Sequence, residues 1–322
     1  MSTTPPQPPQ QGAPSSVSAA EPTVSAAPVT PVPDLIDLPT GKELDESGAL
    51  KLEIARPVRL VVVAGPVGCG KTTLLTSLYE LFQWGQVSGY SFAGSHTLPA
   101  FERRCYLSRT ASERAAPDTE RTPFGEVRYL HLRISPEDLS REIDILFTDV
   151  SGETFERARD STLECRRLTF LRQADHFLLL LDSEKLIVKE RRWEVAHDSM
   201  TLLRSSLDSG MLSANCLVNV LWTKFDYFQA ASGPDHERFL TQLEGEVKTE
   251  FGSRVGRLSF SRIAARPTQV DGLKFGHGLP ELLTYWASDS PRERSMNLLP
   301  PPALGSRESE LYASRHFAGS GE

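Results

Sequence analysis

The amino-acid sequence predicts an α/β fold with a six-stranded, mostly parallel sheet, one antiparallel edge strand and helices on both faces. Short runs rich in leucine or β-branched residues alternate with helical patterns through the middle of the chain, as in sheets covered by helices. Most of these runs are apolar almost throughout, which is typical of strands buried on both faces. The predicted strands are residues 58–64, 127–134, 143–148, 176–181, 217–222 and 258–263.

The run VRYLHLRI at residues 127–134 differs from the others, because its side chains alternate in character. Leu130, Leu132 and Ile134 fall on one face, and His131 and Arg133 fall on the other. We therefore expect this run to be the edge strand. Helical patterns follow the strands at residues 71–82, 153–173, 195–207, 236–251 and 279–286.

The chain of 322 residues is long enough for one large α/β domain, which we place at residues 51–290. Prolines gather outside it, since of 23 in the chain ten precede Thr40 and four follow Ser290. These end segments contain too few large apolar residues to offset the entropy lost on ordering. Residues 1–50 are therefore expected to form a disordered arm rich in proline, alanine and serine, and residues 291–322 a disordered tail.

Charge and cysteine content exclude several classes of protein. The formal net charge of −7 argues against a broad nucleic-acid-binding surface, and the arginines at positions 103, 104, 109 and 114 are expected to form a solvated loop face. The longest apolar runs fall far short of the roughly 20 residues that span a bilayer. The four cysteines are widely spaced, without the pairs typical of disulfide or zinc frameworks. A cytoplasmic protein fits these features.

The segment VVVAGPVGCGKTTLLTSLYELF carries the first functional motif. A buried strand leads into Gly-x-x-x-x-Gly-Lys-Thr, and a helix follows, which is the pattern of a phosphate-binding P-loop. The loop's N–H groups and the start of the helix would face phosphate. Lys71 is expected to neutralise the β- and γ-phosphates and the Thr72 hydroxyl to ligate Mg²⁺. The residues expected to contact nucleotide here are Gly65, Val67, Gly68, Cys69, Gly70, Lys71, Thr72 and Thr73.

The segment TDVSGE follows the predicted strand at residues 143–148. A P-loop protein needs an acidic residue at the end of a neighbouring strand to hold a water molecule bound to Mg²⁺, and Asp149 fits that role. Gly152 is expected to face the terminal phosphate of the nucleotide. TDVSGE thus supplies both a metal-site residue and a phosphate contact.

The strand at residues 217–222 ends in Thr223-Lys224-Phe225-Asp226, which resembles the Thr/Asn-Lys-x-Asp element of Ras-like GTPases. A carboxylate can accept hydrogen bonds from both the ring N–H and the exocyclic amine of guanine, whereas adenine offers no such pair on that edge. Asp226 is therefore expected to select guanine, with the stem of Lys224 packed along the base. The later segment SRIAARP stands where that superfamily has a loop contacting the guanine oxygen, which assigns Ala264 and Ala265 to the base site.

Several stretches together resemble the bacterial double-GTPase family, a translation-factor-like group of Ras-like P-loop GTPases: FAGSHTLPAFERRC, TERTP, YLHLRI, TDVSGE, RQADHFLLLLD, WTKFD and IAARP. The resemblance covers about residues 52–288 and implies a P-loop GTPase fold that uses GTP, GDP and Mg²⁺. It also implies a threonine ligand in the first switch segment, with Thr122 as first candidate and Thr119 as second. That family is associated with multi-gene bacterial conflict systems, so a second GTPase or a helical protein is the implied partner.

Glu153 stands where Ras-like enzymes usually have the glutamine that orients the attacking water. Its carboxylate would repel the γ-phosphate unless a cation compensated. Three interpretations are open: Glu153 acts as a base, it lies at the N-terminus of the helix that starts near Thr154, or it pairs with an arginine. Arg121 and Arg157 are the candidates for charge compensation or a cis arginine finger, and Arg157 has ion-pair spacing from Glu153.

The function predicted from the sequence is a GTP-binding switch that hydrolyses GTP to GDP and phosphate with Mg²⁺. Its catalytic candidates are Lys71, Glu153 and Arg121. Hydrolysis is expected to be slow, because the side chain of Val67 would crowd an arginine supplied by a partner. The alternatives are a scaffold that holds nucleotide without hydrolysing it and an ATP-using P-loop enzyme.

Overall fold

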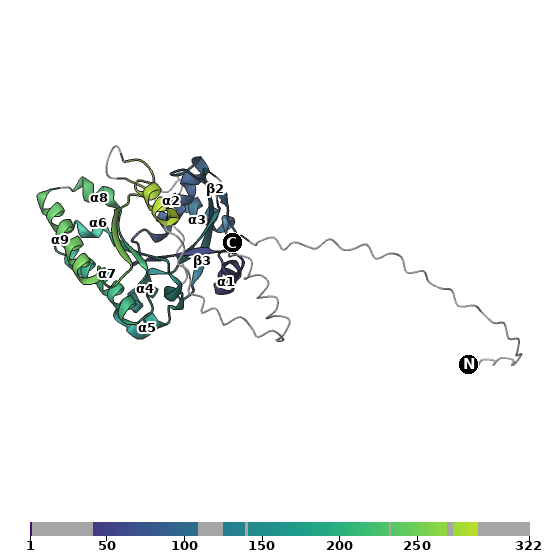
Figure 1. Ribbon diagram of the computed structural model, residues 1–322, viewed down its shortest axis with the longest axis horizontal. Coiled ribbons are helices and arrows are strands. Elements are labelled where there is room, and N and C mark those ends of the chain that lie inside the picture. The colour runs from purple at the N-terminus through teal and green to yellow at the C-terminus, as the bar shows by residue number, and fades with distance from the viewer. Residues whose placement is uncertain (2–40, 109–124, 139–140, 232, 269–272, 289–322) are drawn as a thin grey trace, which may run out of the picture. The chain divides into compact units, whose positions relative to one another are not determined.

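The computed structural model describes residues 1, 41–108, 125–138, 141–231, 233–268 and 273–288. Contacts along the chain separate Met1–Leu38 from Pro39–Glu322, and the fold described below belongs to the second unit (Figure 1). A seven-stranded sheet runs through this unit in the order β2-β3-β4-β1-β5-β6-β7. The strands are β1 (Val58–Ala64), β2 (Tyr90–Gly94), β3 (Arg128–Pro136), β4 (Ile143–Asp149), β5 (His176–Asp182), β6 (Leu217–Thr223) and β7 (Arg257–Arg262).

The predicted fold class is confirmed, with one strand more than expected. Strand β3 pairs antiparallel with both β2 and β4, whereas the other neighbouring strands pair parallel. Strand β3 therefore runs against all the others. The six predicted strands agree with the observed ones to within two residues at each end.

The extra strand β2 lies outside β3, so the run expected at the edge is the second strand of the sheet and pairs along both of its edges. Leu130 and Leu132 lie in a hydrophobic core, and His131 on the opposite face is also buried. The His131 ring lies 2.8 Å from the Asp144 carboxylate of β4, which satisfies its polarity inside the sheet. Strand β2 has the short sequence YSFAG and is only partly buried, which is why its pattern did not stand out.

Two hydrophobic cores lie on opposite faces of the sheet. Strand β1 supplies both, because successive side chains of a strand point to opposite faces: Val61 and Val63 enter one core, and Val62 and Ala64 enter the other. Helices α2 (Lys71–Trp84), α3 (Leu98–Ser108) and α10 (Leu279–Ser288) cover the first core. Helices α1 (Glu46–Ala55), α4 (Gly152–Asp160), α5 (Thr162–Arg166), α7 (Arg192–Asp208), α8 (Phe225–Ala230) and α9 (Pro234–Phe251) cover the second.

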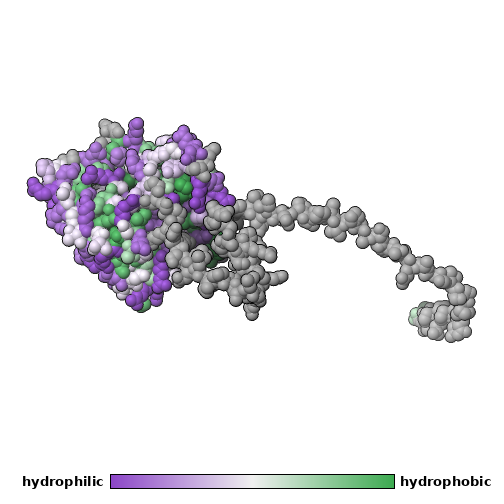
Figure 2. All heavy atoms as spheres, viewed as in Figure 1, coloured by the Kyte–Doolittle hydropathy of each residue, from purple (hydrophilic) through white to green (hydrophobic). Residues whose placement is uncertain are grey.

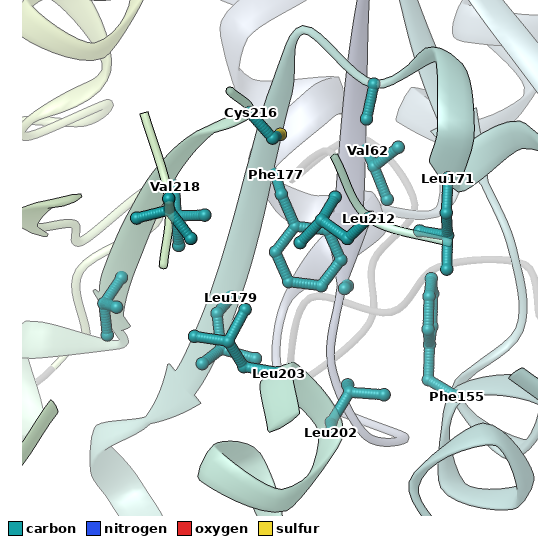
Figure 3. Close-up of a cluster of buried hydrophobic side chains, with 14 of the residues drawn as sticks. Val62, Phe155, Leu171, Phe177, Leu179, Leu202, Leu203, Leu212, Cys216 and Val218 are labelled. Carbon is teal, nitrogen blue, oxygen red and sulfur yellow. The ribbon is translucent and has the colours of Figure 1, made fainter. Parts of the chain in front are cut away.

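Large side chains from several elements fill the second core. Figure 3 shows Phe177 and Leu179 of β5 together with Leu203 of α7, all within 1% of complete burial. Burying an aromatic or leucine side chain of this kind stabilises a fold by roughly 1.5–3 kcal/mol. Because β5 lies next to β1 in the sheet, this packing also fixes the strand that leads into the P-loop.

The predicted helix at residues 153–173 is wrong as a single helix. Helices α4 and α5 and a 3₁₀ helix, η2 (Thr169–Gln173), replace it. Ser161 separates α4 from α5, and its hydroxyl accepts a hydrogen bond from the Glu164 backbone N–H at 3.3 Å. Serine favours such N-cap positions over helix interiors, which accounts for the break. The other four predicted helices agree with α2, α7, α9 and α10 to within three residues at each end.

Ordered structure also appears where the sequence indicated none. Helix α1 crosses residue 50, where we had placed the end of the arm, and Leu44 just before it forms a β-bridge with Tyr129 of β3. The domain therefore includes residues ahead of the predicted boundary. Helix α3, like β2, lies between residues 84 and 125, a segment in which no element was predicted. Short helices α6 (Ser183–Leu186) and α8 were missed as well.

The face of the domain in Figure 2 mixes hydrophilic residues with smaller hydrophobic patches. Exposed large hydrophobic side chains include Ile54, Trp84 and Tyr106, and single exposed residues of this kind are common on folded proteins. Within the residues that the structure describes, none of the helices combines the length and the apolar character needed to cross a membrane.

Candidate nucleotide-binding site

The parallel strands β1, β4, β5 and β6 end at the same edge of the sheet. The P-loop follows β1, Asp149 is the last residue of β4, and Thr223 is the last residue of β6. Ligands of open α/β sheets bind at this edge. The fold therefore brings together residues that are far apart in the sequence and that were assigned separately to phosphate, metal and base.

The P-loop turns between β1 and α2. Gly70 precedes the first helical residue with a φ of 97°, a left-handed conformation that glycine adopts without strain. The Lys71 ammonium donates hydrogen bonds to the carbonyl oxygens of Gly65 and Pro66, both at 2.9 Å. Burial raises the pKa of the Cys69 thiol, so this side chain stays neutral behind the loop. Lys71 is thus already held over the turn, where a phosphate would bind.

Gly152, the first residue of α4, packs directly against the P-loop. A Cβ atom at this position would lie 2.4 Å from the backbone nitrogen of Val67 and 2.7 Å from the carbonyl carbon of Pro66. Larger residues do not fit at such distances, so the close approach requires glycine. The segment TDVSGE therefore meets the P-loop through its glycine.

A second contact between α4 and the P-loop was not foreseen from the sequence. The carboxylate of Glu156 accepts a hydrogen bond from the backbone N–H of Val67, with a distance of 3.2 Å between nitrogen and Oε1. Residues 67 and 156 are 89 positions apart. The acidic side chain of α4 that meets the P-loop is therefore Glu156, three residues beyond Glu153.

Glu153 lies in the first turn of α4, which begins at Gly152, one residue before the helix predicted over residues 153–173. Ser151 caps the helix, since its side chain accepts a hydrogen bond from the Thr154 backbone N–H at 3.3 Å. Of the three open interpretations, pairing with Arg157 is not observed, since within the described residues no salt bridge joins Glu153 to Arg157. The position of Glu153 at a helix N-terminus agrees with the helix-terminus interpretation, because negative charge is favoured there.

Asp149 belongs to a buried chain of charges. Its Oδ2 accepts a hydrogen bond from Nη2 of Arg104, and Nη1 of the same guanidinium donates to the Glu43 carboxylate. Arg104 and Asp149 are 5% and 4% exposed, and buried charges of this kind destabilise a fold unless they are paired. Burial alone would lower the pKa of Arg104, but the charges of Asp149 and Glu43 raise it. The predicted solvated position of Arg104 is therefore wrong, whereas Arg103 beside it is exposed.

Asp226 lies at a cavity of about 220 Å³ that also borders the end of the P-loop. Its side chain is buried, and Oδ2 accepts a hydrogen bond from the Thr268 backbone N–H at 2.9 Å. Gly70 and Thr73 line the same cavity from the P-loop side. A base bound against Asp226 would thus be close to a phosphate bound at the loop.

The two alanines of SRIAARP differ in position. Ala265 lines the cavity beside Asp226. Ala264 is buried, and its backbone N–H donates to the carbonyl oxygen of His277 at 3.1 Å. Of the pair predicted from the sequence, Ala265 is therefore the residue that a base would meet.

Lys224 is held by two carboxylates next to the cavity. Its ammonium donates to Asp182 at 3.0 Å and to Glu184 at 2.7 Å, and its backbone has a φ of 51°, which is uncommon for lysine. Burial alone would lower the pKa of Lys224, but the two carboxylates raise it, so the ammonium is charged. Sequence reasoning missed both partners, although Asp182 ends the apolar strand FLLLLD in the same way as Asp149 ends β4.

The Thr223 hydroxyl connects the base side of the site to the phosphate side. Its oxygen lies 2.7 Å from the carbonyl oxygen of Cys69 in the P-loop and 3.1 Å from that of Leu181 in β5. A hydroxyl has one proton, which two such acceptors can share. Strand β6 is thereby attached to both neighbouring segments at the site.

Some residues assigned from the sequence lie outside the part of the chain that the structure describes. These are Arg121, Thr122, its alternative Thr119, and the arginines at positions 109 and 114.

The oxygen donors at the site suit Mg²⁺ bound together with phosphate. Thr72 lies in the first turn of α2, and Asp149 ends β4, the strand beside β1. Among the described residues, no group of three or more histidine, cysteine, aspartate or glutamate side chains could hold a metal ion. Mg²⁺ usually keeps several waters and needs only one or two protein oxygens plus substrate phosphates. The residues present therefore fit a nucleotide-bound Mg²⁺.

A larger cavity, of about 770 Å³, lies apart from this site, between the start of α1, the start of β3 and helices α4 and α5. Its charged side chains are partly neutralised by one another: Arg128 pairs with Glu126 at 2.7 Å, and Arg167 pairs with Glu164 at 2.6 Å. The cavity at Asp226 is smaller, but it is the one lined by residues that the sequence assigned to nucleotide binding.

A protein-family model described as Double-GTPase 2 matches residues 59–287, which is most of the chain. The chain belongs to the Double-GTPase 2 family. The match begins in β1, ahead of the P-loop, and ends in α10, so this Double-GTPase 2 domain includes every described residue of the phosphate and base sites. Family membership and the arrangement of the site identify a GTP-binding P-loop protein.

Two solved structures are similar to this Double-GTPase 2 protein at low identity. One belongs to the signal recognition particle receptor SRb-GTP/SRX complex of Chaetomium thermophilum, with 15% identity, a TM-score of 0.40, and coverage of 72% of this chain and 96% of that chain. The other is the cytosolic domain of the FeoB iron transporter of T. maritima in its apo form, with 16% identity, a TM-score of 0.33, and coverage of 73% and 66%. No curated protein matches the chain.

Proposed function

We propose that this Double-GTPase 2 protein binds GTP with Mg²⁺ and hydrolyses it to GDP and phosphate, acting as a switch. The observation that carries the proposal is the buried carboxylate of Asp226, which lies at a cavity that the P-loop also borders. Such a carboxylate matches the two N–H donors of guanine and offers nothing equivalent to adenine. The ATP-using alternative is therefore disfavoured.

Each step of the proposed reaction has a candidate residue in this chain. Lys71 and the P-loop N–H groups would stabilise the charge that develops on the transferred phosphoryl group. Thr72, Thr122 and, through water, Asp149 would hold Mg²⁺, which would neutralise negative charge on the phosphates. Glu153 at the start of α4 would accept a proton or a hydrogen bond from the attacking water, and Arg121 would supply compensating positive charge.

A second candidate function, a scaffold that holds nucleotide without hydrolysing it, is favoured by one contact. The Glu156 carboxylate at the Val67 N–H places negative charge on the P-loop. A further phosphate near that position would be repelled. Both functions allow a partner protein, and the resemblance to conflict-system GTPases supports a second GTPase or a helical protein in that role.

Single-turnover hydrolysis tests the proposal. GTP and ATP are each mixed with the full chain and Mg²⁺, and inorganic phosphate is measured for the natural protein, Lys71→Ala and Glu153→Gln. Cleavage of GTP alone, lost in Lys71→Ala, is expected, and a rate change in Glu153→Gln reports whether that carboxylate helps. Retention of nucleotide through purification without cleavage of GTP supports the scaffold, and equal cleavage of ATP contradicts the role of Asp226.

A further inference from the structure

Arg104 joins the proposed magnesium site to the segment that precedes α1. The residue comes from α3, in the region between residues 84 and 125 where the sequence indicated no element. Its guanidinium contacts the Asp149 carboxylate with Nη2, and with Nη1 it contacts both the Glu43 carboxylate and, at 3.4 Å, the carbonyl oxygen of Ala100 in its own helix. One buried side chain therefore contacts the end of β4, the first turn of its own helix and the segment before α1.

The shape of the guanidinium makes these contacts directional. It is planar, always charged, and presents its N–H groups in a fixed fork, so contacts at Nη1 and Nη2 set its orientation in the plane. The oxygen of Asp149 that accepts from Nη2 therefore has a donor at a defined position. Asp149 is 4% exposed, and the buried Arg104 guanidinium forms an ion pair with its carboxylate.

Glu43 and its neighbour Leu44 are held in place by several hydrogen bonds. Glu43 accepts hydrogen bonds from Arg103 and Arg104 of α3, and its neighbour Leu44 exchanges two backbone hydrogen bonds with Tyr129 of β3, at 3.0 and 2.9 Å. Tyr129 is paired in register with Thr148, the residue before Asp149. The N-terminal segment thus reaches Asp149 by two routes, one through Arg104 and one through the sheet.

We propose that Arg104 is a positioning residue for Asp149, holding its carboxylate in the orientation that binds a water of the nucleotide-bound Mg²⁺, with Glu43 bracing Arg104 from the opposite side. The inference rests on the proposed function, because it assigns Asp149 to the magnesium site. Partners that orient a metal-site ligand affect metal affinity without touching the metal. Arg104 acts in this way, and the segment before α1 is part of the support of the site.

The chain offers a matched control one residue away. Arg103 also pairs with Glu43 but its side chain is 52% exposed, and surface pairs of this kind contribute little. Arg103→Met removes the same charge and the same type of contact with Glu43. It leaves the buried pair between Arg104 and Asp149 in place.

The test measures how Mg²⁺ slows the release of fluorescent GDP from the full chain. Release rates are recorded over a range of free Mg²⁺ concentrations and in excess chelator, for the natural protein, Asp149→Ala, Arg104→Met, Arg104→Lys, Glu43→Gln and Arg103→Met. The first readout is the Mg²⁺ concentration that gives half of the slowing. The second is the release rate without Mg²⁺, which a general disturbance of the fold would increase and a positioning role would leave unchanged.

Arg104→Met is expected to raise the half-maximal Mg²⁺ concentration by about tenfold or more, the usual size of a second-sphere effect. Arg104→Lys, which keeps the charge but loses the fork, and Glu43→Gln are expected to raise it by about threefold, and Arg103→Met by less than about twofold. If Arg104→Met does not fold, Arg104→Lys and Glu43→Gln carry the test.

The contrary outcomes are separable. Tighter Mg²⁺ binding in the Arg104 and Glu43 variants would mean that Arg104 competes with the metal for Asp149, which overturns the positioning role. If Asp149→Ala loses the effect of Mg²⁺, two other results in the Arg104 and Glu43 variants would also overturn the positioning role. One is an unchanged Mg²⁺ dependence. The other is a release rate without Mg²⁺ that rises in the same proportion as the half-maximal Mg²⁺ concentration. If the natural protein shows no Mg²⁺ dependence, or Asp149→Ala retains it, the proposed magnesium site itself is wrong.

Discussion

The carboxylate of Glu156 on α4 accepts a hydrogen bond from the backbone N–H of Val67 in the P-loop, at 3.2 Å. A P-loop N–H normally faces phosphate oxygens, so in this arrangement a carboxylate of the protein occupies one of the loop's donors. Phosphate and Glu156 carry the same sign of charge. We therefore expect nucleotide binding to be coupled to the position of α4, which also contacts the P-loop through Gly152.

Glu156→Gln is expected to tighten binding of a non-hydrolysable GTP analogue. The amide oxygen can still accept from Val67, but the charge is gone, and relief of about 1 kcal/mol of repulsion corresponds to roughly fivefold in Kd. Titration of a fluorescent analogue measures the change. Glu190→Gln removes an equally charged but exposed side chain and is expected to leave Kd unaltered. Weaker binding in Glu156→Gln alone would contradict the repulsion.

Asp226→Asn is expected to change base preference from guanine toward xanthine. An asparagine amide can still accept from the Thr268 N–H, and its NH₂ group can donate to the carbonyl that xanthine has in place of the exocyclic amine of guanine. We expect GDP affinity to fall at least about tenfold, because a buried donor of guanine would lose its partner. Competition by GDP, xanthosine diphosphate and ADP measures the preference. Equal losses for all three nucleotides would point to a damaged site instead.

Gly152→Ala is expected to weaken nucleotide binding by about tenfold or more, since the added Cβ would come within 2.4 Å of the Val67 backbone nitrogen and separate α4 from the P-loop. Gly245→Ala is the matched control. A Cβ at position 245 meets nothing within 4 Å, and alanine in an exposed helix interior is expected to stabilise the fold by about 0.5–1 kcal/mol. Calorimetry and thermal unfolding give affinity and stability for both variants. Full affinity in Gly152→Ala would show that the loop adapts.

Stability is expected to fall in acid because of Glu43. Burial alone would raise the pKa of Glu43, but hydrogen bonds from Arg104 and Arg103 and the charge of Arg104 outweigh it and lower the pKa from 4.5 to about 2. A depressed carboxylate pKa contributes stability that is present above the unfolded value and lost as the pH falls toward the folded value. The affected window is therefore about pH 5 to 2.

Urea unfolding at pH 5 and at pH 3 measures this contribution. For the natural protein, about 1–2 kcal/mol of the expected loss belongs to Glu43, after allowance for the solvent that reaches its carboxylate. Glu43→Gln is expected to be less stable than the natural protein at pH 5. Its free energy of unfolding is expected to fall less between pH 5 and pH 3. An identical pH dependence for the two proteins would show that another group is responsible.

Local patterns in the sequence were sufficient for much of the fold and part of the site. The P-loop, Asp149 and Asp226 each follow a buried strand, and the order of the strands along the chain placed them at one edge of the sheet. Arg104, Glu43 and Glu156 could not be found in this way. Their partners are 45, 61 and 89 positions distant, and nothing in their immediate neighbours indicates the contact. The break at Ser161 was visible in principle, since serine is a preferred N-cap.

The Thr223 hydroxyl contacts Cys69 of the P-loop and Leu181 of β5, and these contacts affect which ligands can fill both subsites. This hydroxyl joins the strand that ends next to Asp226 to the loop that would receive phosphate, so we expect the distance between the two subsites to vary little. A base and a diphosphate would then bind together only at the separation that one ribose provides. Guanine alone, or a guanine nucleotide with a lengthened linker, would occupy one of the two subsites and not the other.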